Sequence, residues 1–247
     1  MAGLMTKATN FKPRLHRGWF NPQGRTQNEN YAFRAGRGLD VAFRWIRRHV
    51  VQQVTVALTG VPVSSRVIVN FVAYQVAWFA CVLGGAHGLP WVGVAVTAGA
   101  VAILLAGSPA PWRDAALITV VSLIGALWDG LLAGLGLLVY PSGMILPWLA
   151  PVWIIAMWAG FATTFYVSMR WLLGRWWLAS LFGAIGGPLA FYAGMRLGAV
   201  SFPDPVAALA VLAVGWAVLM PLTAWIAVKL EADPGADEPA AASPQPL

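Results

Sequence analysis

Long apolar runs dominate the chain from Val67 onward, and short turn-rich stretches separate them. The runs predict six helical spans, at about 67–87, 90–107, 115–138, 145–168, 176–198 and 206–229. An α-helix rises about 1.5 Å per residue, so roughly 20 apolar residues cross the hydrocarbon of a bilayer. The second run is the shortest and is expected to be little tilted or partly interfacial. The separating stretches, such as HGLP, YPSGM and SFPDP, are typical of turns.

The two ends of the chain lack such runs. Residues 1–38 are polar and aperiodic, which predicts disorder, and residues 230–247 form an acidic, Ala/Pro-rich tail with the same prediction. In residues 39–62 the apolar positions recur with a helical period, opposite an arginine-rich face. This pattern indicates an amphipathic helix, lying either in the membrane interface or against the protein itself.

Composition supports a membrane protein. Hydrophobic residues make up 59% of the 247 positions and charged residues only 10%, whereas soluble domains carry about 25% charged residues. We therefore expect an all-α fold, a polytopic membrane helix bundle of about six transmembrane helices within residues 67–229. Cys81 is the single cysteine, so an intrachain disulfide is excluded.

The basic residues predict the orientation. If the N-terminus is cytoplasmic, fifteen of the sixteen Lys and Arg residues lie on the cytoplasmic side, and only Arg196 lies outside. Both termini are then cytoplasmic. This clustering explains the net charge of +7 without a nucleic-acid partner, and it indicates a multi-pass membrane protein.

Asp129 lies near the middle of the third predicted span. An aspartate at the centre of a bilayer costs about 2.5–3.5 kcal/mol, so its side chain should face the bundle interior. Gln75, Trp158 and the Gly187-Pro188 break are at similar depth and are its candidate partners. Because no basic residue lies at that depth, we expect Asp129 to be largely protonated. Its role is either to fasten helices together or to take part in function.

The fifth predicted span is the most irregular, because Pro188 removes a backbone donor and glycines precede it. Tyr192 and Arg196 share one face. Arg196 is a candidate for binding an anionic headgroup near the outer interface, or it extends to water. An internal similarity links this span to the third: SLIGALWDG (122–130) resembles SLFGAIGGP (180–188), as expected if a helix pair was duplicated or if small residues recur by chance.

Residues that would support catalysis or metal binding do not group in the sequence. No histidine lies in a span core to activate Ser168, and His87 stands alone near a turn. We therefore predict no catalytic residues, no metal site and no cofactor. The protein is more consistent with a non-enzyme, although an enzyme stays open.

Four ordered motifs carry a family resemblance: NFVAYQVAWFACVLGG, LWDGLLAGLG, WIIAMWAGFATTFYVSMRWLL and GAIGGPLAFYAGMRLGAV. Over about 67–229 the chain resembles a bacterial inner-membrane family known as domain of unknown function two-eight-seven-eight. Matching positions include Asn70, Gln75, Asp129, Trp158, Pro188, Tyr192 and Arg196, which are our candidate binding residues. The family often has NHS in the motif of the fourth predicted span, where this chain has YVS. Residues 1–65 fall outside the resemblance, so translation could start near Val63 or Val67.

The resemblance implies a compact multi-pass protein, with an association to membrane-lipid metabolism. Three hypotheses follow. The first is an accessory subunit that binds membrane lipids or another membrane protein, such as a lipid-modifying enzyme. The second is a lipid-modifying enzyme with Asp129 as acid or base and Arg196 as anion anchor. The third is a small-solute or proton-coupled transporter, with its site at a broken fifth span.

Overall fold

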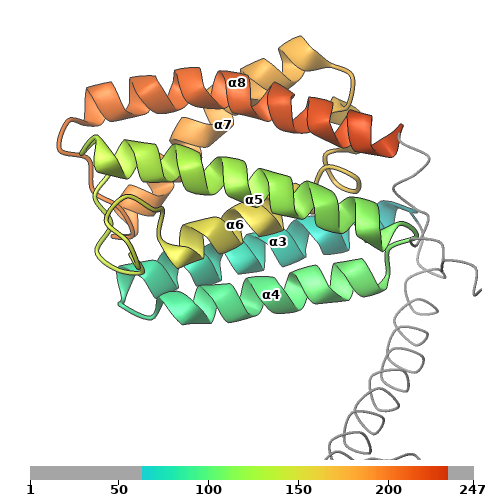
Figure 1. Cartoon of the computed structure of the whole chain (residues 1–247), viewed down its shortest axis with the longest axis horizontal. Helices are drawn as coiled ribbons and strands as arrows, with labels where there is room; N and C mark the ends of the chain where they lie inside the picture. Colours follow the sequence, from blue (N-terminus) through green and yellow to red (C-terminus); the bar gives the residue numbers. More distant parts are fainter. Residues whose placement is uncertain (1–62, 233–247) are drawn as a thin grey trace, which may run out of the picture. The chain divides into compact units, whose positions relative to one another are not determined.

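The computed structural model describes residues 63–232, and this part of the chain is helical (Figure 1). The predictions for residues 1–38 and 39–62, and for the tail beyond residue 232, lie outside it. The elements are α3 (Val63–Ala86), α4 (Pro90–Ala106), α5 (Pro111–Gly134), α6 (Val152–Ala162), the 3₁₀ turn η2 (Arg170–Leu172), α7 (Trp176–Arg196) and α8 (Pro205–Glu231). Within residues 63–232 the all-α prediction is confirmed.

Four of these helices are long and apolar enough to cross a membrane, namely α3, α5, α7 and α8. Helix α4 has 17 residues, which agrees with the expectation that the second span is short. Helix α6 has 11 residues. At about 1.5 Å per residue, α6 is only about 17 Å long and does not reach across a hydrocarbon layer by itself.

The extent predicted for the fourth span, 145–168, is therefore wrong, and local chemistry explains why. Pro147 and Pro151 hold the preceding segment out of a helix, because the residue before a proline disfavours the helical conformation. At the other end, the Thr163 hydroxyl donates to the Gly160 carbonyl and the Thr164 hydroxyl donates to the Phe161 carbonyl, both at 2.6 Å. The chain then continues through turns to η2.

The starts of three helices follow from proline. Pro90, Pro111 and Pro205 occupy the first turn of α4, α5 and α8, where the missing N–H needs no partner. This is why α5 begins at Pro111 rather than at residue 115, as the hydropathy predicted. At the start of α8, the Asp204 carboxylate accepts hydrogen bonds from the backbone N–H groups of Val206 and Ala207 at 3.0 and 3.1 Å.

Helix α7 contains Pro188 but is continuous from Trp176 to Arg196. The expectation of a broken fifth span is therefore wrong. A proline in a helix interior removes one backbone hydrogen bond, and packing against a neighbouring helix compensates for this loss. Here α7 packs extensively on α8. Gly183 makes the close approach possible, because a Cβ at this position would lie 2.2 Å from the Trp216 carbonyl oxygen.

The helices pack in two groups. Helix α3 packs on α4 and α6, α6 also packs on α4 and α5, and α7 packs on α8, with α5 joining the groups through α8. Figure 1 shows α5 lying between α8 and the pair formed by α3 and α4, with the short α6 behind it. The pairing leaves α3 and α7 lining a shared space, which is described below.

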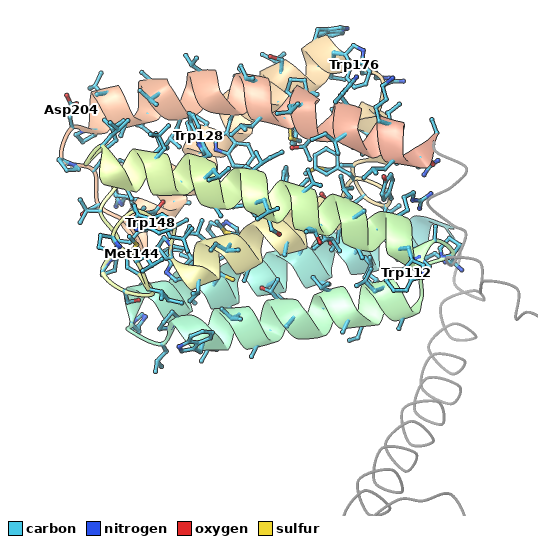
Figure 2. All side chains as sticks on the ribbon, in the orientation of Figure 1. Trp112, Trp128, Met144, Trp148, Trp176 and Asp204 are labelled. Atoms are coloured by element: carbon cyan, nitrogen blue, oxygen red, sulfur yellow. The ribbon has the colours of Figure 1, made fainter. Side chains whose placement is uncertain are left out.

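Large apolar side chains are exposed along these helices, for example Leu127 at 71% and Val214 at 70%. A soluble surface rarely presents such extended apolar faces, whereas lipid-facing helices require them. Exposed tryptophans lie near helix ends, and Figure 2 shows Trp112 and Trp176 towards one end of the described helices and Trp148 towards the other. This placement matches the preference of indole rings for membrane interfaces.

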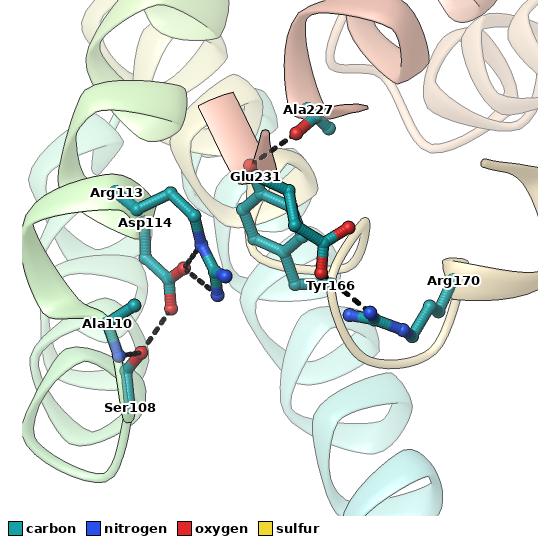
Figure 3. Close-up of polar contacts among 8 residues, drawn as sticks. All are labelled: Ser108, Ala110, Arg113, Asp114, Tyr166, Arg170, Ala227 and Glu231. Carbon is teal, nitrogen blue, oxygen red and sulfur yellow. Dashed lines mark hydrogen bonds and ion pairs between the residues drawn. The ribbon is translucent and has the colours of Figure 1, made fainter. Parts of the chain in front are cut away.

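Polar contacts gather where α5 and α7 begin and α8 ends (Figure 3). Arg113 pairs with Asp114 at 3.1 Å, and its guanidinium lies 4.2 Å from the centre of the Tyr166 ring. Arg170 pairs with Glu231 at 2.6 Å across the gap between η2 and α8. This end of the helices is the one for which the basic residues predict a cytoplasmic position.

Candidate functional site

Asp129 is fully buried on α5 and contacts α6 directly. Its Oδ2 atom accepts a hydrogen bond from the Trp158 indole N–H at 2.6 Å. One helical turn earlier, Gly125 leaves room for the indole, because a Cβ there would lie 2.1 Å from Trp158 Cγ. Asp129 thus faces the bundle interior as predicted, and of the partners expected on the first, fourth or fifth span it bonds to Trp158 in the fourth. Its protonation stays a prediction.

A second indole stacks on the first. The rings of Trp158 and Trp216 are nearly parallel, at 8°, with centroids 4.8 Å apart. Phe161 presents its ring at steep angles to both, with centroid distances of 5.7 and 5.5 Å. Trp216 in turn lies against α7 at Gly187, where a Cβ would be 2.2 Å from its Cγ. The stack therefore joins α5 and α6 to α7 and α8.

The stacked indoles form part of the wall of a cavity of about 560 Å³. Its volume falls in the range of about 300–1,000 Å³ that is usual for small-molecule sites. The lining side chains come from α3, α6, α7 and α8, with Tyr140 and the segments after α6 and α7 at its ends. Buried members such as Trp153 and Phe161 form its depth, whereas Phe71 on α3 and Leu189 on α7 are 51% and 61% exposed. The cavity thus opens sideways between α3 and α7.

The lining is almost entirely apolar or aromatic. None of the lining residues carries a charge; polar side chains are contributed by Tyr74, Gln75, Tyr140, Thr164 and Ser168, together with indole N–H groups. Asp129 itself is not among the lining residues, because the Trp158 indole stands between α5 and the cavity. Such a site holds apolar groups and offers a small number of hydrogen bonds.

The predicted candidate residues divide into two sets. Gln75 and Trp158 line the cavity. Asn70 lies beyond one end of it, where its Oδ1 accepts from the Ser168 hydroxyl at 2.7 Å and its Nδ2 donates to the Thr163 carbonyl at 3.4 Å. Asn70 thus ties α3 to the chain that follows α6, at the polar corner where the family motif differs.

Pro188, Tyr192 and Arg196 on α7 are not brought to the cavity. None of the three is a lining residue, and Tyr192 and Arg196 are exposed. Of the three partners predicted for Asp129, the structure shows a hydrogen bond to Trp158 and none to the Gly187-Pro188 segment. Arg196 ends α7, and its binding of an anionic headgroup stays a prediction.

Sequence reasoning missed Trp216 and Tyr140. Trp216 follows Trp158 by 58 positions, which is also the separation of Ser180 from Ser122 in the internal similarity. Extending that similarity by one helix would have found Trp216. Tyr140 had no such signal, because it lies in the connection between α5 and α6. Two backbone hydrogen bonds between Val139 and Ser201, at 3.0 and 2.8 Å, tie this connection to the one between α7 and α8.

Within residues 63–232, no group of three or more His, Cys, Asp or Glu side chains is placed to hold a metal ion. The features that the described residues do share are long apolar helices, an exposed apolar surface and a lateral cavity. These features define a helical membrane protein with a cavity that opens between two of its apolar helices.

The particular family follows from the sequence comparison. Residues 67–222 match the family described as protein of unknown function (DUF2878), and the chain belongs to that family. No curated protein and no solved structure matches the chain. The resemblance seen in the four motifs is thereby confirmed.

Proposed function

We propose that this protein is a multi-pass protein of a bacterial inner membrane that binds the acyl chain of a membrane lipid in the cavity between α3 and α7. The observation that carries this proposal is the lateral opening. The cavity is lined by apolar side chains, and its mouth is formed by exposed residues of two helices that are apolar enough to lie in lipid. A lipid chain can enter such an opening without crossing water.

Binding is favoured over catalysis by the position of Asp129. The carboxyl group is buried, is occupied by the Trp158 indole and does not line the cavity, so it is separated from any ligand there. A transport site at a broken fifth span is disfavoured because α7 is continuous. The function that fits best is therefore an accessory subunit, which presents a bound lipid to another membrane protein such as a lipid-modifying enzyme.

A photoreactive lipid tests this proposal. The protein is placed in vesicles of phosphatidylethanolamine and phosphatidylglycerol that contain a phospholipid with a diazirine on one acyl chain. After illumination, mass spectrometry locates the labelled residues. We expect labelling of two residues that line the cavity, the half-buried Met157 and the buried Phe161, in addition to the exposed faces. Labelling confined to exposed residues such as Leu127 would contradict the proposal.

Two glycines provide a matched pair of variants. A Cβ at Gly186 or at Gly99 meets no atom within 4 Å, but only Gly186 lines the cavity. Gly186→Leu therefore adds a side chain to the cavity wall at a position where its Cβ meets no neighbour, and we expect it to reduce labelling of Met157 and Phe161. Gly99→Leu on α4 should leave that labelling unchanged. Equal effects of both variants would show that the labelling does not depend on the cavity.

A further inference from the structure

The α7 side of the cavity mouth follows one stripe along the helix. Phe182 and Leu189 both line the cavity, yet they are 43% and 61% exposed. They are seven residues apart, and Arg196 follows Leu189 after seven more. An α-helix drifts only about 20° over seven residues, so the three side chains leave α7 on nearly the same side. Arg196 therefore lies outside the cavity but in line with its mouth.

The cavity also extends along α7 to the level of Arg196. Its lining includes Ala193, less than one turn before Arg196, and Val200, shortly after the helix ends. At this end α3 and α7 come together, because a Cβ at Gly198 would lie 3.9 Å from the Cβ of Ala86. Arg196 is thus placed where the mouth closes.

The Arg196 guanidinium is available to a ligand. Its side chain is exposed, and neither of the two ion pairs within residues 63–232 includes it. Among the Lys and Arg residues of this part of the chain, Arg196 is the only one at the end where α7 terminates. A guanidinium presents N–H donors in a planar fork that matches the oxygens of a phosphate.

The opposite end of the same stripe provides a comparison. Arg175 precedes Phe182 by seven residues and is also exposed. No residue of α7 before Phe182 lines the cavity, so about 10 Å of helix separates Arg175 from the α7 lining. Arg170 is next to the lining residue Trp171, but it is paired with Glu231 at 2.6 Å. The exposed base that adjoins the cavity without an ion-pair partner among the described residues is therefore Arg196.

We propose that the bound lipid is an anionic phospholipid whose phosphate pairs with Arg196 outside the mouth, and whose acyl chain runs between α3 and α7 towards Phe182. This inference rests on the proposed acyl-chain binding and adds the headgroup class and the direction of the chain. The 14 residues from Phe182 to Arg196 extend about 21 Å along α7. One leaflet contributes about 15 Å of hydrocarbon, so a phospholipid can reach from one to the other.

This arrangement leaves the charge of the lipid outside the apolar lining. No lining residue is charged, and burying an anion there without a cation would be costly. With the phosphate at Arg196, only the acyl chain enters the cavity. The lipid then comes from the leaflet at the end where α7 terminates.

The first test compares two diazirine phospholipids that share their acyl chains, phosphatidylglycerol and phosphatidylethanolamine, at equal mole fraction in the vesicles. The readout is labelling of Met157 and Phe161. We expect phosphatidylglycerol to label them about fivefold more strongly, which corresponds to about 1 kcal/mol for one arginine near the membrane surface. Equal labelling by both lipids would overturn the headgroup assignment. Absence of labelling by either lipid would instead contradict the proposed function.

Variants assign the preference to one side chain. Arg196→Gln should remove the preference for phosphatidylglycerol and leave labelling by phosphatidylethanolamine unchanged, whereas Arg196→Lys should keep most of the preference. Arg175→Gln is the matched control, because Arg175 is an exposed arginine on the same stripe but away from the lining. We expect this control to retain the full preference. A preference that survived in Arg196→Gln, or that was lost equally in Arg175→Gln, would overturn the inference.

The direction of the chain is tested with two phosphatidylglycerol probes that carry the diazirine next to the ester or next to the terminal methyl group. Val200 and Met169 line opposite ends of the cavity, and only labelling that Gly186→Leu reduces is counted. We expect the probe with the diazirine next to the ester to label Val200 more strongly than Met169, and the other probe to show the reverse. The opposite pattern would place the headgroup at the end where α7 begins and would overturn the assignment to Arg196.

Discussion

At the scale of single residues, one short hydrogen bond accounts for the presence of the Asp129 carboxyl group inside the bundle. A carboxyl group in the apolar interior of α5 is tolerated because the Trp158 N–H donates to it and because Gly125 lets the indole approach. The Oδ1 atom is buried and has no partner among the described residues. The pair fastens α5 to α6, which is the structural alternative that the sequence left open.

Substitutions at Asp129 separate its hydrogen bond from its charge. Asp129→Asn keeps an acceptor for the Trp158 N–H, so it should lower the free energy of unfolding by less than about 1 kcal/mol. Asp129→Leu leaves that N–H buried and unpaired, and should cost about 1–3 kcal/mol. The measurement is thermal unfolding in detergent, followed with a thiol-reactive dye, since Cys81 is buried and is the only cysteine. Equal losses in both variants would show that the hydrogen bond from Trp158 does not account for the stability that Asp129 provides.

At the scale of helices, small residues decide which pairs pack closely. Gly183 admits the backbone of α8, Gly125 admits Trp158, and Gly215 admits Trp128, whose ring would lie 2.1 Å from an added Cβ. Membrane helices lack a strong hydrophobic drive to associate, so close contact through small residues supplies much of the packing. Gly186 belongs to the same run as Gly183 but faces open space in the cavity.

Gly183→Ala and Gly186→Ala should therefore have opposite effects on stability. The first forces a Cβ to within 2.2 Å of the Trp216 carbonyl oxygen, and overpacking of this kind costs about 1–3 kcal/mol. The second adds a methyl group to open space and should be neutral or stabilising by up to about 1 kcal/mol, because alanine is the better helix former. The same unfolding assay with Cys81 compares them. A stable Gly183→Ala variant would argue against close packing of α7 on α8.

At the scale of the whole molecule, charged groups are distributed unequally between the two ends of the described helices. Ion pairs and arginines occupy the end where α5 and α7 begin (Figure 3), whereas Arg196 and Asp204 mark the opposite end. The exposed arginine-glutamate pair contributes at most about 1 kcal/mol to stability. The excess of basic residues at this end of the helices predicts that it faces the cytoplasm.

Cysteine accessibility tests this orientation. In a Cys81→Ala background, Ala232→Cys and Pro203→Cys place single thiols at exposed positions at the two ends of α8. We expect a membrane-impermeant maleimide to label position 203 in spheroplasts and position 232 only in inverted vesicles. The reverse pattern would invert the proposed topology. Labelling of both positions from one side would show that α8 does not span the membrane.

The sequence by itself determined the helical class, the positions of the long apolar helices and the interior direction of Asp129. These features follow from local composition and from the high cost of exposing polar groups to lipid, which act along a single segment. The sequence did not determine where α6 ends, because threonine hydroxyls and prolines override its hydropathy. It also did not determine that α7 stays continuous through Pro188, since packing on α8 decides this. The cavity was not predictable, because it arises where α3 and α7 pack on different partners. Only the tertiary structure brings Trp216 and Tyr140, from separate segments, to the wall of one apolar site.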